Sequence, residues 1–169
     1  MMIILKKLSI KKNISLNYLK WMNDNDVQKY TEQRFKKHSL KDIRNFVENK
    51  NSSKDEFLFG IFIKKKKLLH IGNIKLGPVN FIHKTAFISY FIGEKSFWGK
   101  SYGSKAISEI IKIAKKKKLK KLKAGVYEQN LASQKVLKKN GFKIEGRFKY
   151  EKVYNGRRHT YFEYGKILK

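Results

Sequence analysis

Small residues gather in one turn of the chain, between a strand-like segment that ends at Gly93 and a helix-like run that follows Ser104. The turn has the sequence WGKSYGS, and its glycines and serines keep bulk away from the backbone. The first N–H groups of a helix have no partner within the helix, and the helix dipole adds partial positive charge there. Such a turn can therefore bind a phosphate. The same composition is also ordinary for a loop, so a second motif is needed to decide.

A second polar segment follows the strand-like sequence KLKAGVY. Asn130 is a good N-cap for a short helix, and Asn140 with Gly141 supplies the C-terminal stop of that helix. Neither segment contains the dinucleotide-binding pattern G-x-G-x-x-G or the P-loop pattern G-x-x-x-x-G-K-S/T. The two segments therefore place polar groups at two strand-to-helix junctions without matching either of these nucleotide-binding loops.

Together, the two segments resemble the cofactor-binding half of the GCN5-related N-acetyltransferase (GNAT) family. The resemblance is strongest to the subgroup that acetylates ribosomal-protein N-termini and to its relatives in surface-sugar pathways, and it covers about residues 56–168. In that family a loop of the pattern R/Q-x-x-G-x-G/A wraps the pyrophosphate of acetyl-CoA, and here residues 98–103 occupy its place. Trp98 stands where Arg or Gln is usual, and Ser101 where Gly is usual. The resemblance implies acetyl-CoA as the acyl donor.

The resemblance also implies roles for individual residues. The backbone N–H near Ile92 would polarise the acetyl carbonyl, and Asn130 would meet the pantetheine arm. Ser133 would protonate the departing thiolate, because Leu137 stands where many members of the family carry Tyr. The implied cofactor-binding residues are Phe91, Ile92, Gly93, Gly99, Lys100, Ser101, Tyr102, Gly103, Ser104 and Asn130.

The acceptor side of the site is expected near Glu32, in the sequence YTEQRF between two predicted helices. In the resembled family this region lines the acceptor pocket, so Glu32 could hold the acceptor amine or remove its proton through water. Glu32 could equally be a surface carboxylate paired to Arg34 or to a lysine. Glu128, at a strand end, and water itself are alternative bases that the sequence does not separate.

Composition narrows the protein class. The chain has 169 residues, the size of one domain (1–169), with 41% hydrophobic residues and no Cys. No apolar run is long enough to span a bilayer and no signal-peptide pattern begins the chain, so we expect a cytoplasmic protein without membrane partners. The histidines (His38, His70, His83 and His159) lack metal-ligand spacing, which predicts no metal site.

The formal net charge of +28 is an ambiguous feature. Lysines dominate it and are accompanied by many Asn, Ile and Phe, as an AT-rich genome would give. We therefore interpret the charge as spread over solvated faces and expect no specific nucleic-acid site. A field of this sign still attracts polyanions such as CoA or nucleotide-linked substrates, and it argues against cationic polyamines as acceptors.

Hydrophobic periodicity predicts a mixture of strands and helices, and the resemblance implies an α+β fold with the GNAT arrangement. Strand-like segments begin near Ile3, Glu56 and Leu68, and the Asn155-Gly156 pair predicts a C-terminal hairpin. Ser39, with Asp42 three residues later, predicts the start of a helix that buries Ile43, Phe46 and Val47. We expect a mostly antiparallel, twisted sheet of about seven strands, splayed at the cofactor site and flanked by about four helices.

The predicted function is acetyl-CoA-dependent N-acetylation of a primary amine by direct transfer, in a monomer or a homodimer. A nucleotide-linked amino sugar and a protein N-terminus are both open as acceptors. The competing hypothesis is a basic RNA- or ribosome-binding protein that has kept the fold and lost the reaction, which would account for the departures at Trp98 and Ser101.

Overall fold

One seven-stranded sheet organises the protein, in the order β1-β2-β3-β4-β5-β7-β6. The computed structural model describes residues 2–64 and 66–169. All neighbouring strands are antiparallel except β4 and β5, which are parallel. The strands are β1 (Ile3–Lys7), β2 (Phe57–Lys64), β3 (Leu68–Asn80), β4 (Thr85–Ile92), β5 (Lys121–Tyr127), β6 (Lys143–Tyr154) and β7 (Arg157–Ile167). The strands predicted to begin near Ile3, Glu56 and Leu68 and the hairpin at Asn155-Gly156 are confirmed.

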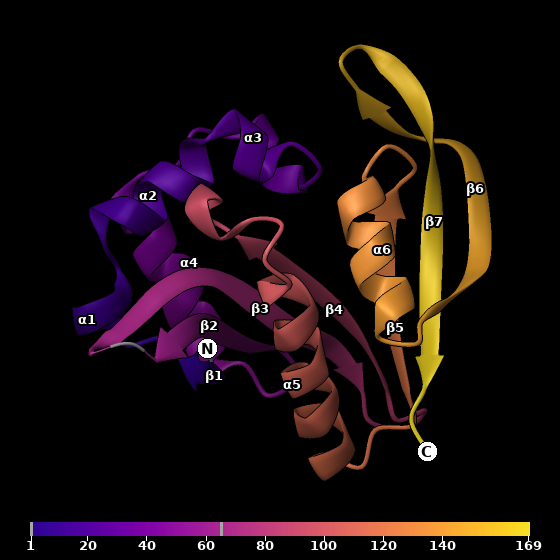
Figure 1. Ribbon diagram of the computed structural model, residues 1–169, viewed down its shortest axis with the longest axis horizontal. Helices are drawn as coiled ribbons and strands as arrows, with labels where there is room; N and C mark the ends of the chain where they lie inside the picture. The colour runs from indigo at the N-terminus through magenta and orange to yellow at the C-terminus, as the bar shows by residue number, and fades with distance from the viewer. Residues whose placement is uncertain (1, 65) are drawn as a thin grey trace.

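Four helices longer than one turn cover the sheet, as the sequence predicted. They are α2 (Leu16–Asn23), α4 (Leu40–Ser52), α5 (Tyr102–Lys116) and α6 (Leu131–Lys139). Shorter helical segments join them: α1 (Ile10–Asn13), α3 (Asn25–Gln28) and the 3-10 turns η1 (Glu32–Phe35) and η2 (Lys95–Phe97). In Figure 1, α5 and α6 lie in front of the sheet and the N-terminal helices lie to one side of them. No helix of the described chain is long and apolar enough to cross a membrane.

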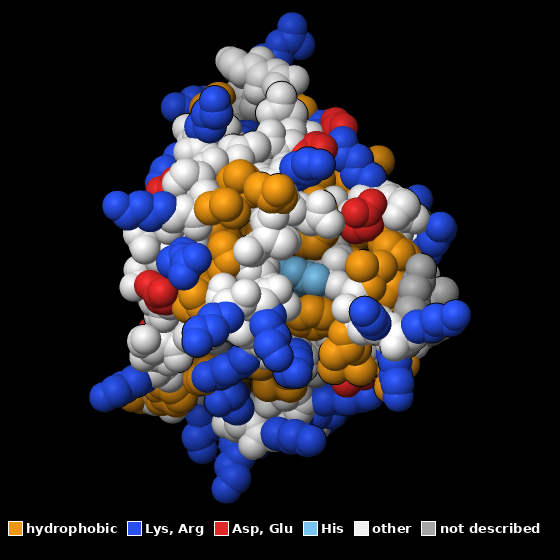
Figure 2. Space-filling view, turned by 90° about the vertical axis from the view of Figure 1, so that its left-hand side faces the viewer, with side chains coloured by type: hydrophobic (Ala, Val, Ile, Leu, Met, Phe, Trp, Pro, Cys, Tyr) orange, Lys and Arg blue, Asp and Glu red, His pale blue; other side chains and the backbone are white. Residues whose placement is uncertain are grey.

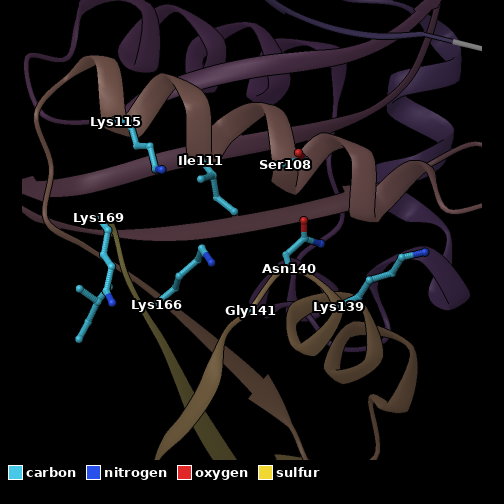
Figure 3. Close-up of a pocket in the computed structure, with 9 residues that line it drawn as sticks. Ser108, Ile111, Lys115, Lys139, Asn140, Gly141, Lys166 and Lys169 are labelled. Atoms are coloured by element: carbon cyan, nitrogen blue, oxygen red, sulfur yellow. The ribbon is translucent and has the colours of Figure 1, made fainter.

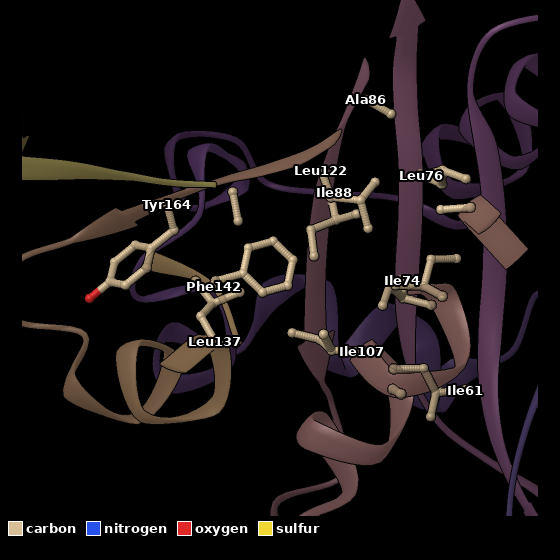
Figure 4. Close-up of a cluster of buried hydrophobic side chains, with 14 of the residues drawn as sticks. Ile61, Ile74, Leu76, Ala86, Ile88, Ile107, Leu122, Leu137, Phe142 and Tyr164 are labelled. Carbon is tan, nitrogen blue, oxygen red and sulfur yellow. The ribbon is translucent and has the colours of Figure 1, made fainter. Parts of the chain in front are cut away.

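The sheet separates two apolar cores, because successive residues of a strand face opposite sides. Ile61 and Ile63 of β2 point into the larger core under α5 and α6, whereas Leu58 and Phe62 point into a smaller core under α2 and α4. Figure 4 shows the larger core between the sheet and the two C-terminal helices. This core holds α5 and α6 in place on either side of the junction between β4 and β5.

Helix α5 is anchored by an apolar stripe along one of its faces. Ala106, Ile107, Ile110 and Ala114 are fully buried and pack against strands of the sheet. Burying an Ile side chain contributes roughly 1.5–3 kcal/mol. The N-terminal end of α5 is therefore held firmly at the cofactor loop.

The predicted start of α4 is confirmed, but one of its three predicted core residues is not buried. Ser39 Oγ accepts from Asp42 N, and the Asp42 carboxylate accepts from Ser39 N at 2.8 Å, which completes a capping box. Ile43 and Val47 are buried, whereas Phe46 is 39% exposed. The prediction that Phe46 points inward was wrong, because the ring lies on the flank of the helix, where Lys50 Nζ sits 5.6 Å from its centroid.

Positive charge is distributed over the surface. Figure 2 shows Lys and Arg side chains scattered across one whole face, interspersed with apolar groups and with a few acidic ones. This distribution fits the interpretation of solvated faces better than it fits a single basic stripe.

Candidate active site

Strands β4 and β5 separate after a short paired segment. Their parallel pairing covers Thr85–Lys121, Ala86–Leu122 and Phe87–Lys123. Beyond these pairs, residues 88–92 of β4 and 124–127 of β5 have no partner across the gap within the described chain, although each strand stays paired on its other side. The sheet therefore contains a slot that opens toward the C-terminal ends of both strands. This is the splay that the sequence predicted.

The β4 side of the slot presents free backbone groups. Gly93 N donates to Ile71 O at 2.8 Å, so Ile71 and Gly93 form a hydrogen-bonded pair of the antiparallel ladder. Backbone groups alternate in such a ladder, so those of Ile92 and Tyr90 point away from β3 and into the slot. The Ile92 carbonyl is occupied there by Trp98, whose indole Nε1 donates to it at 2.7 Å. The N–H of Ile92 consequently faces the slot, as the predicted role requires.

Trp21 fixes the position of this strand end from the opposite face of the sheet. Its ring lies directly over Gly93, so closely that a side chain at Gly93 would collide with it. Glu94 N donates to Ile71 O at 3.1 Å, which continues the pairing past Gly93. Trp21 therefore leaves room only for a glycine at this strand end.

The N-terminus of α5 lacks a side-chain cap among the described residues, in contrast to α2, α4 and α6. Its N-cap residue, Ser101, has the left-handed φ of 62°. The amides of Tyr102, Gly103 and Ser104 are thus those of an uncapped first turn. Ser104 Oγ accepts from Asn140 Nδ2 at 3.0 Å, which ties this turn to the end of α6. The loop retains its open helix end despite the departures from the family pattern.

Asn130 and Ser133 begin α6 on the other side of the slot. Asn130 Oδ1 accepts from Ser133 N at 3.1 Å, which confirms the N-cap prediction. The Ser133 hydroxyl lies 3.2 Å from the Tyr90 hydroxyl. Tyr90 belongs to β4, so this contact connects the two walls of the slot.

Tyr90 is a site residue that the sequence reasoning missed. Its ring packs against the first turn of α5, where a Cβ at Gly103 would lie 3.2 Å from the ring. Burial raises the pKa of the Tyr90 phenol to about 12, with the Ser133 hydrogen bond acting in the opposite direction. The alternation of KTAFISYFIG could have indicated it, because Tyr90 shares a face with the buried Ala86 and Ile88.

Glu32 lies at the end of β5. The Tyr127 hydroxyl donates to Glu32 Oε1 at 3.1 Å, and Lys152 Nζ lies 3.6 Å from the same oxygen. Arg34 Nη2 donates to the Tyr127 hydroxyl at 2.9 Å. Burial raises the pKa of Tyr127, so the phenol remains a donor to the carboxylate. The Glu32 carboxylate thus lies near the slot, as a residue that holds the acceptor would. It is also paired to a lysine, as a surface carboxylate would be.

Arg34 joins three segments around this end of the slot. Its guanidinium donates to Thr31 O at 2.6 Å, to Tyr127 and, at 2.7 Å, to Val153 O of the β6–β7 hairpin. The Tyr30 ring contacts the rings of Tyr127 and Tyr154 in the same region. The segment around η1 and the C-terminal hairpin therefore meet over the end of β5.

A family model described as the acetyltransferase (GNAT) domain matches residues 3–143. The chain belongs to this family. The match confirms the family and the enzyme class that the two motifs predicted. Among curated proteins, none matches the sequence.

Solved GNAT structures share the fold at low sequence identity. The RimL ribosomal L7/L12 alpha-N-protein acetyltransferase in complex with coenzyme A is 20% identical, with a TM-score of 0.85 over 99% of this chain and 94% of that one. Spermidine N-acetyltransferase from Vibrio cholerae, with CoA and spermine, is 19% identical, with a TM-score of 0.84 over 99% and 96%. The microcin C7 self-immunity acetyltransferase MccE, with acetyl-CoA and AMP, is 22% identical, with a TM-score of 0.80 over 99% and 93%. These similarities confirm the predicted fold.

The GNAT chain has a hollow of about 660 Å³ between the C-terminal halves of α5 and α6 (Figure 3). Lys139 and Asn140 end α6, Ser108 belongs to α5, and Lys115, Lys166 and Lys169 complete the lining. No acidic side chain lines the hollow among the described residues, so it favours an anionic group. The sequence could not show that these lysines, from three separate elements, come together.

The described residues of the GNAT domain contain no group of three or more His, Asp or Glu side chains that could hold a metal ion. Among the described residues, the side chains that meet at the slot are phenols, hydroxyls and amides, with the Glu32 carboxylate, Arg34 and Lys152 at one end. Their chemistry is hydrogen bonding and proton transfer.

Proposed function

We propose that this protein transfers an acetyl group from acetyl-CoA to a primary amine, with both substrates bound at once. The observation that carries the proposal is the slot between β4 and β5, which ends beside the uncapped N-terminus of α5. A slot with free backbone groups suits an extended arm that carries amides, and an open helix end suits a diphosphate. The slot and the helix end follow one another in the same order as the pantetheine arm and the diphosphate of a CoA thioester.

The cofactor-binding residues fall into three groups. The backbone of Phe91, Ile92 and Gly93 forms one wall of the slot for the pantetheine arm, and Asn130 stands opposite. The loop residues Gly99, Lys100, Ser101, Tyr102, Gly103 and Ser104 receive the diphosphate through their amides. The lysine-lined hollow between α5 and α6 offers room and charge for the nucleotide end.

Acetyl-CoA supplies the activated acyl group. The Ile92 N–H stabilises the negative charge that develops on the acetyl oxygen as the amine attacks. The loss of one such donor typically costs on the order of 3 kcal/mol of barrier. Ser133 donates a proton to the leaving sulfur, and Tyr90, at 3.2 Å from Ser133, supports that hydroxyl as a second donor. Because its pKa is raised, Tyr90 keeps its proton at neutral pH.

Glu32 is the proposed acceptor-side residue. Its carboxylate can hold the acceptor ammonium or take its proton through water, with Glu128 or water alone as alternatives. Lys152 Nζ lies 3.6 Å from the Glu32 carboxylate, so the space beside this carboxylate fits a cationic group. An amine must lose a proton to attack, and the thiol leaves readily, so the demand for a strong base is small.

A protein N-terminus and a nucleotide-linked amino sugar are both retained as acceptors. The similar proteins are described as a ribosomal L7/L12 alpha-N-protein acetyltransferase, a spermidine N-acetyltransferase and a microcin C7 self-immunity acetyltransferase. The net charge of +28 disfavours a polycation such as spermidine and favours an anionic handle.

Acetyl-CoA binding and turnover test the proposal directly. We expect saturable binding of acetyl-CoA that raises the melting temperature, and release of CoA that depends on an added amine. The alternative, an inactive RNA- or ribosome-binding protein, predicts RNA binding that survives high salt without any CoA release. A parallel screen of nucleotide-linked amino sugars and N-terminal peptides would identify the acceptor.

A further inference from the structure

A second hollow, of about 390 Å³, lies beneath the β6–β7 hairpin, and of its lining residues the reaction described above involves only Glu128, as an alternative base. Its charged and polar lining includes Glu128, Arg147, Lys149, Arg158, His159 and Thr160. In Figure 1 this hairpin projects beyond α6 at the C-terminal end of β5. The hollow is therefore separate from the lysine-lined hollow at the other end of α6.

An irregularity in β6 shapes the hollow. Phe148 pairs with Tyr161 and Lys152 pairs with His159, so residues 149–151 oppose Thr160 alone. Within this bulge Tyr150 has a φ of 54°, a left-handed conformation that is costly for a tyrosine. Arg158 Nη1 donates to Tyr150 O at 3.1 Å and holds the bulge in this shape. Bulges commonly re-aim side chains beside functional sites, and this one sets Lys149 at the rim.

The charges around the hollow are only partly balanced. Arg147 and Lys149 of β6 and Arg158 of β7 contribute three cations, against the single carboxylate of Glu128. Arg147 Nη2 lies 3.7 Å from Glu128 Oε1, and the two side chains are 60% and 42% exposed, so this pair is weak. Lys149 has no ion pair among the described residues. Two arginines and a lysine around one hollow suit a phosphate, which accepts several hydrogen bonds from guanidinium groups.

The hollow adjoins the end of the slot where the acceptor amine must lie. Glu128 directly follows β5, and its N–H donates to Thr160 O at 3.0 Å. The same short segment continues to Asn130 and Ser133, which begin α6. The tip of the hairpin reaches across to η1 through the bond from Arg34 to Val153 O. A molecule with its amine in the slot can thus extend under the hairpin.

We propose that this hollow binds a phosphate or diphosphate group of the acceptor, so that the preferred acceptor is a phosphate-bearing primary amine. The inference rests on the acyl transfer proposed above. It assigns Arg147, Lys149 and Arg158 to acceptor specificity. It also excludes polyamines, because their ammonium groups would meet three cations here.

Binding of inorganic pyrophosphate, measured calorimetrically with CoA at saturation, tests the hollow itself. Saturating CoA fills the cofactor site, so the remaining binding reports a second anion site. We expect a double variant, Arg147→Gln with Lys149→Gln, to weaken binding by about tenfold, the effect of losing charge-assisted hydrogen bonds. Arg158 stays unchanged in this variant because it holds the bulge.

A matched control removes the same charge elsewhere. The control is a double variant, Lys41→Gln with Arg44→Gln, at two residues on the exposed side of α4. It should leave pyrophosphate binding within about twofold of the parent, a small electrostatic effect. Equal weakening in both double variants would show that the diffuse positive field alone binds the anion. That result, or the absence of binding in the parent, would overturn the proposal.

Turnover with a matched pair of acceptors tests the specificity. Glucosamine and glucosamine 6-phosphate present the same amine, and we expect the parent to favour the phosphorylated sugar by about tenfold or more in kcat/KM. In the variant at Arg147 and Lys149, the ratio of kcat/KM for the phosphorylated sugar to that for glucosamine should fall toward one. Equal kcat/KM for both sugars in the parent would overturn the phosphate site and leave acyl transfer intact. If no amine releases CoA, the proposed reaction fails, and the pyrophosphate measurement still decides on the hollow.

Discussion

At the scale of single residues, the contact between Tyr90 and Ser133 is the chemical centre of the slot. It joins β4 to α6 at 3.2 Å across a gap in the sheet. A serine hydroxyl alone is a weak acid, whereas a phenol beside it offers a second donor to a thiolate. We therefore propose that the pair takes the place of the tyrosine that the resemblance implies at Leu137.

Tyr90→Phe and Ser133→Ala should each lower kcat by roughly tenfold to a hundredfold, with the KM for acetyl-CoA nearly unchanged. The reason is that each removes a donor to the leaving sulfur without removing a binding contact. The measurement is steady-state CoA release. Equal rates for Ser133→Ala and the parent would remove Ser133 from the mechanism.

An acetyl thioester of a more acidic thiol provides the control for these variants. Its leaving group needs less protonation, so both variants should recover most of the lost rate with this donor. An equal loss with both donors would show that the two residues act on folding or on substrate placement instead.

At the scale of elements, the loop before α5 keeps a conformation that its sequence does not favour. Ser101 has a φ of 62°, a region where a residue with a Cβ is strained by roughly 1–2 kcal/mol. Trp98 stands where the family pattern has Arg or Gln. Its indole N–H donates to the Ile92 carbonyl, and this hydrogen bond compensates for part of that departure. The loop geometry is thus kept despite two departures from the family pattern, which fits the proposal that the backbone, and not the side chains, binds the diphosphate.

Ser101→Gly should therefore stabilise the protein by up to about 1 kcal/mol, since glycine adopts this φ freely but is more flexible when unfolded. Affinity for acetyl-CoA should be retained or improved, because the amides keep their positions. Urea denaturation and calorimetry measure the two effects. A lower stability in the glycine variant would show that the Ser101 side chain supports the loop.

The junction of α2 with the sheet contains a partly buried histidine. His70 Nε2 lies 3.0 Å from Gly72 O and 2.9 Å from Asn73 Oδ1, so this nitrogen carries the proton in the neutral ring. Phe62 stacks on the ring, and Tyr18 and Trp21 meet it edge-on. Burial lowers the pKa of His70 from 6.5.

Stability should fall as the pH drops below about 6.5, because the unfolded chain then binds a proton at His70 that the folded protein does not bind. The decrease should continue until the lowered folded-state pKa is reached. The free energy of unfolding measured in urea at about pH 7.5 and pH 5.5 tests this expectation. In His70→Gln the difference between the two pH values should shrink; an unchanged difference would assign it to other groups.

At the scale of the whole molecule, the charge of +28 extends well beyond the slot. Lysines and arginines are scattered over the face in Figure 2, whereas the slot depends on hydrogen bonds and on one helix end. Cytoplasmic location, a single domain over residues 1–169 and a monomeric or dimeric state remain predictions from the sequence.

RNA binding should therefore be nonspecific and sensitive to salt. Between about 50 and 200 mM salt, we expect the affinity for a single-stranded RNA to fall by on the order of a thousandfold, as counterion release predicts for several phosphate contacts. Amine-dependent CoA release should persist at the higher salt. RNA binding that resists salt, together with loss of turnover, would favour the competing hypothesis of an RNA-binding module.

The sequence by itself determined the elements and their order, because these depend on local chemistry. The stripe from Ala106 to Ala114, the capping box at Ser39, the N-cap at Asn130 and the Asn155-Gly156 turn are each specified by residues close together in the chain. The two loop motifs also identified the family, since both use backbone geometry that only particular short sequences allow.

Only the tertiary structure decided which distant residues share a site. Tyr90 meets Ser133 across the slot, Glu32 meets Tyr127 and Lys152, and three cations surround the hollow under the hairpin. None of these pairs has a sequence spacing that reveals it. They come together because β4 and β5 part after three paired residues and because a bulge bends β6, and both features depend on packing across the whole sheet.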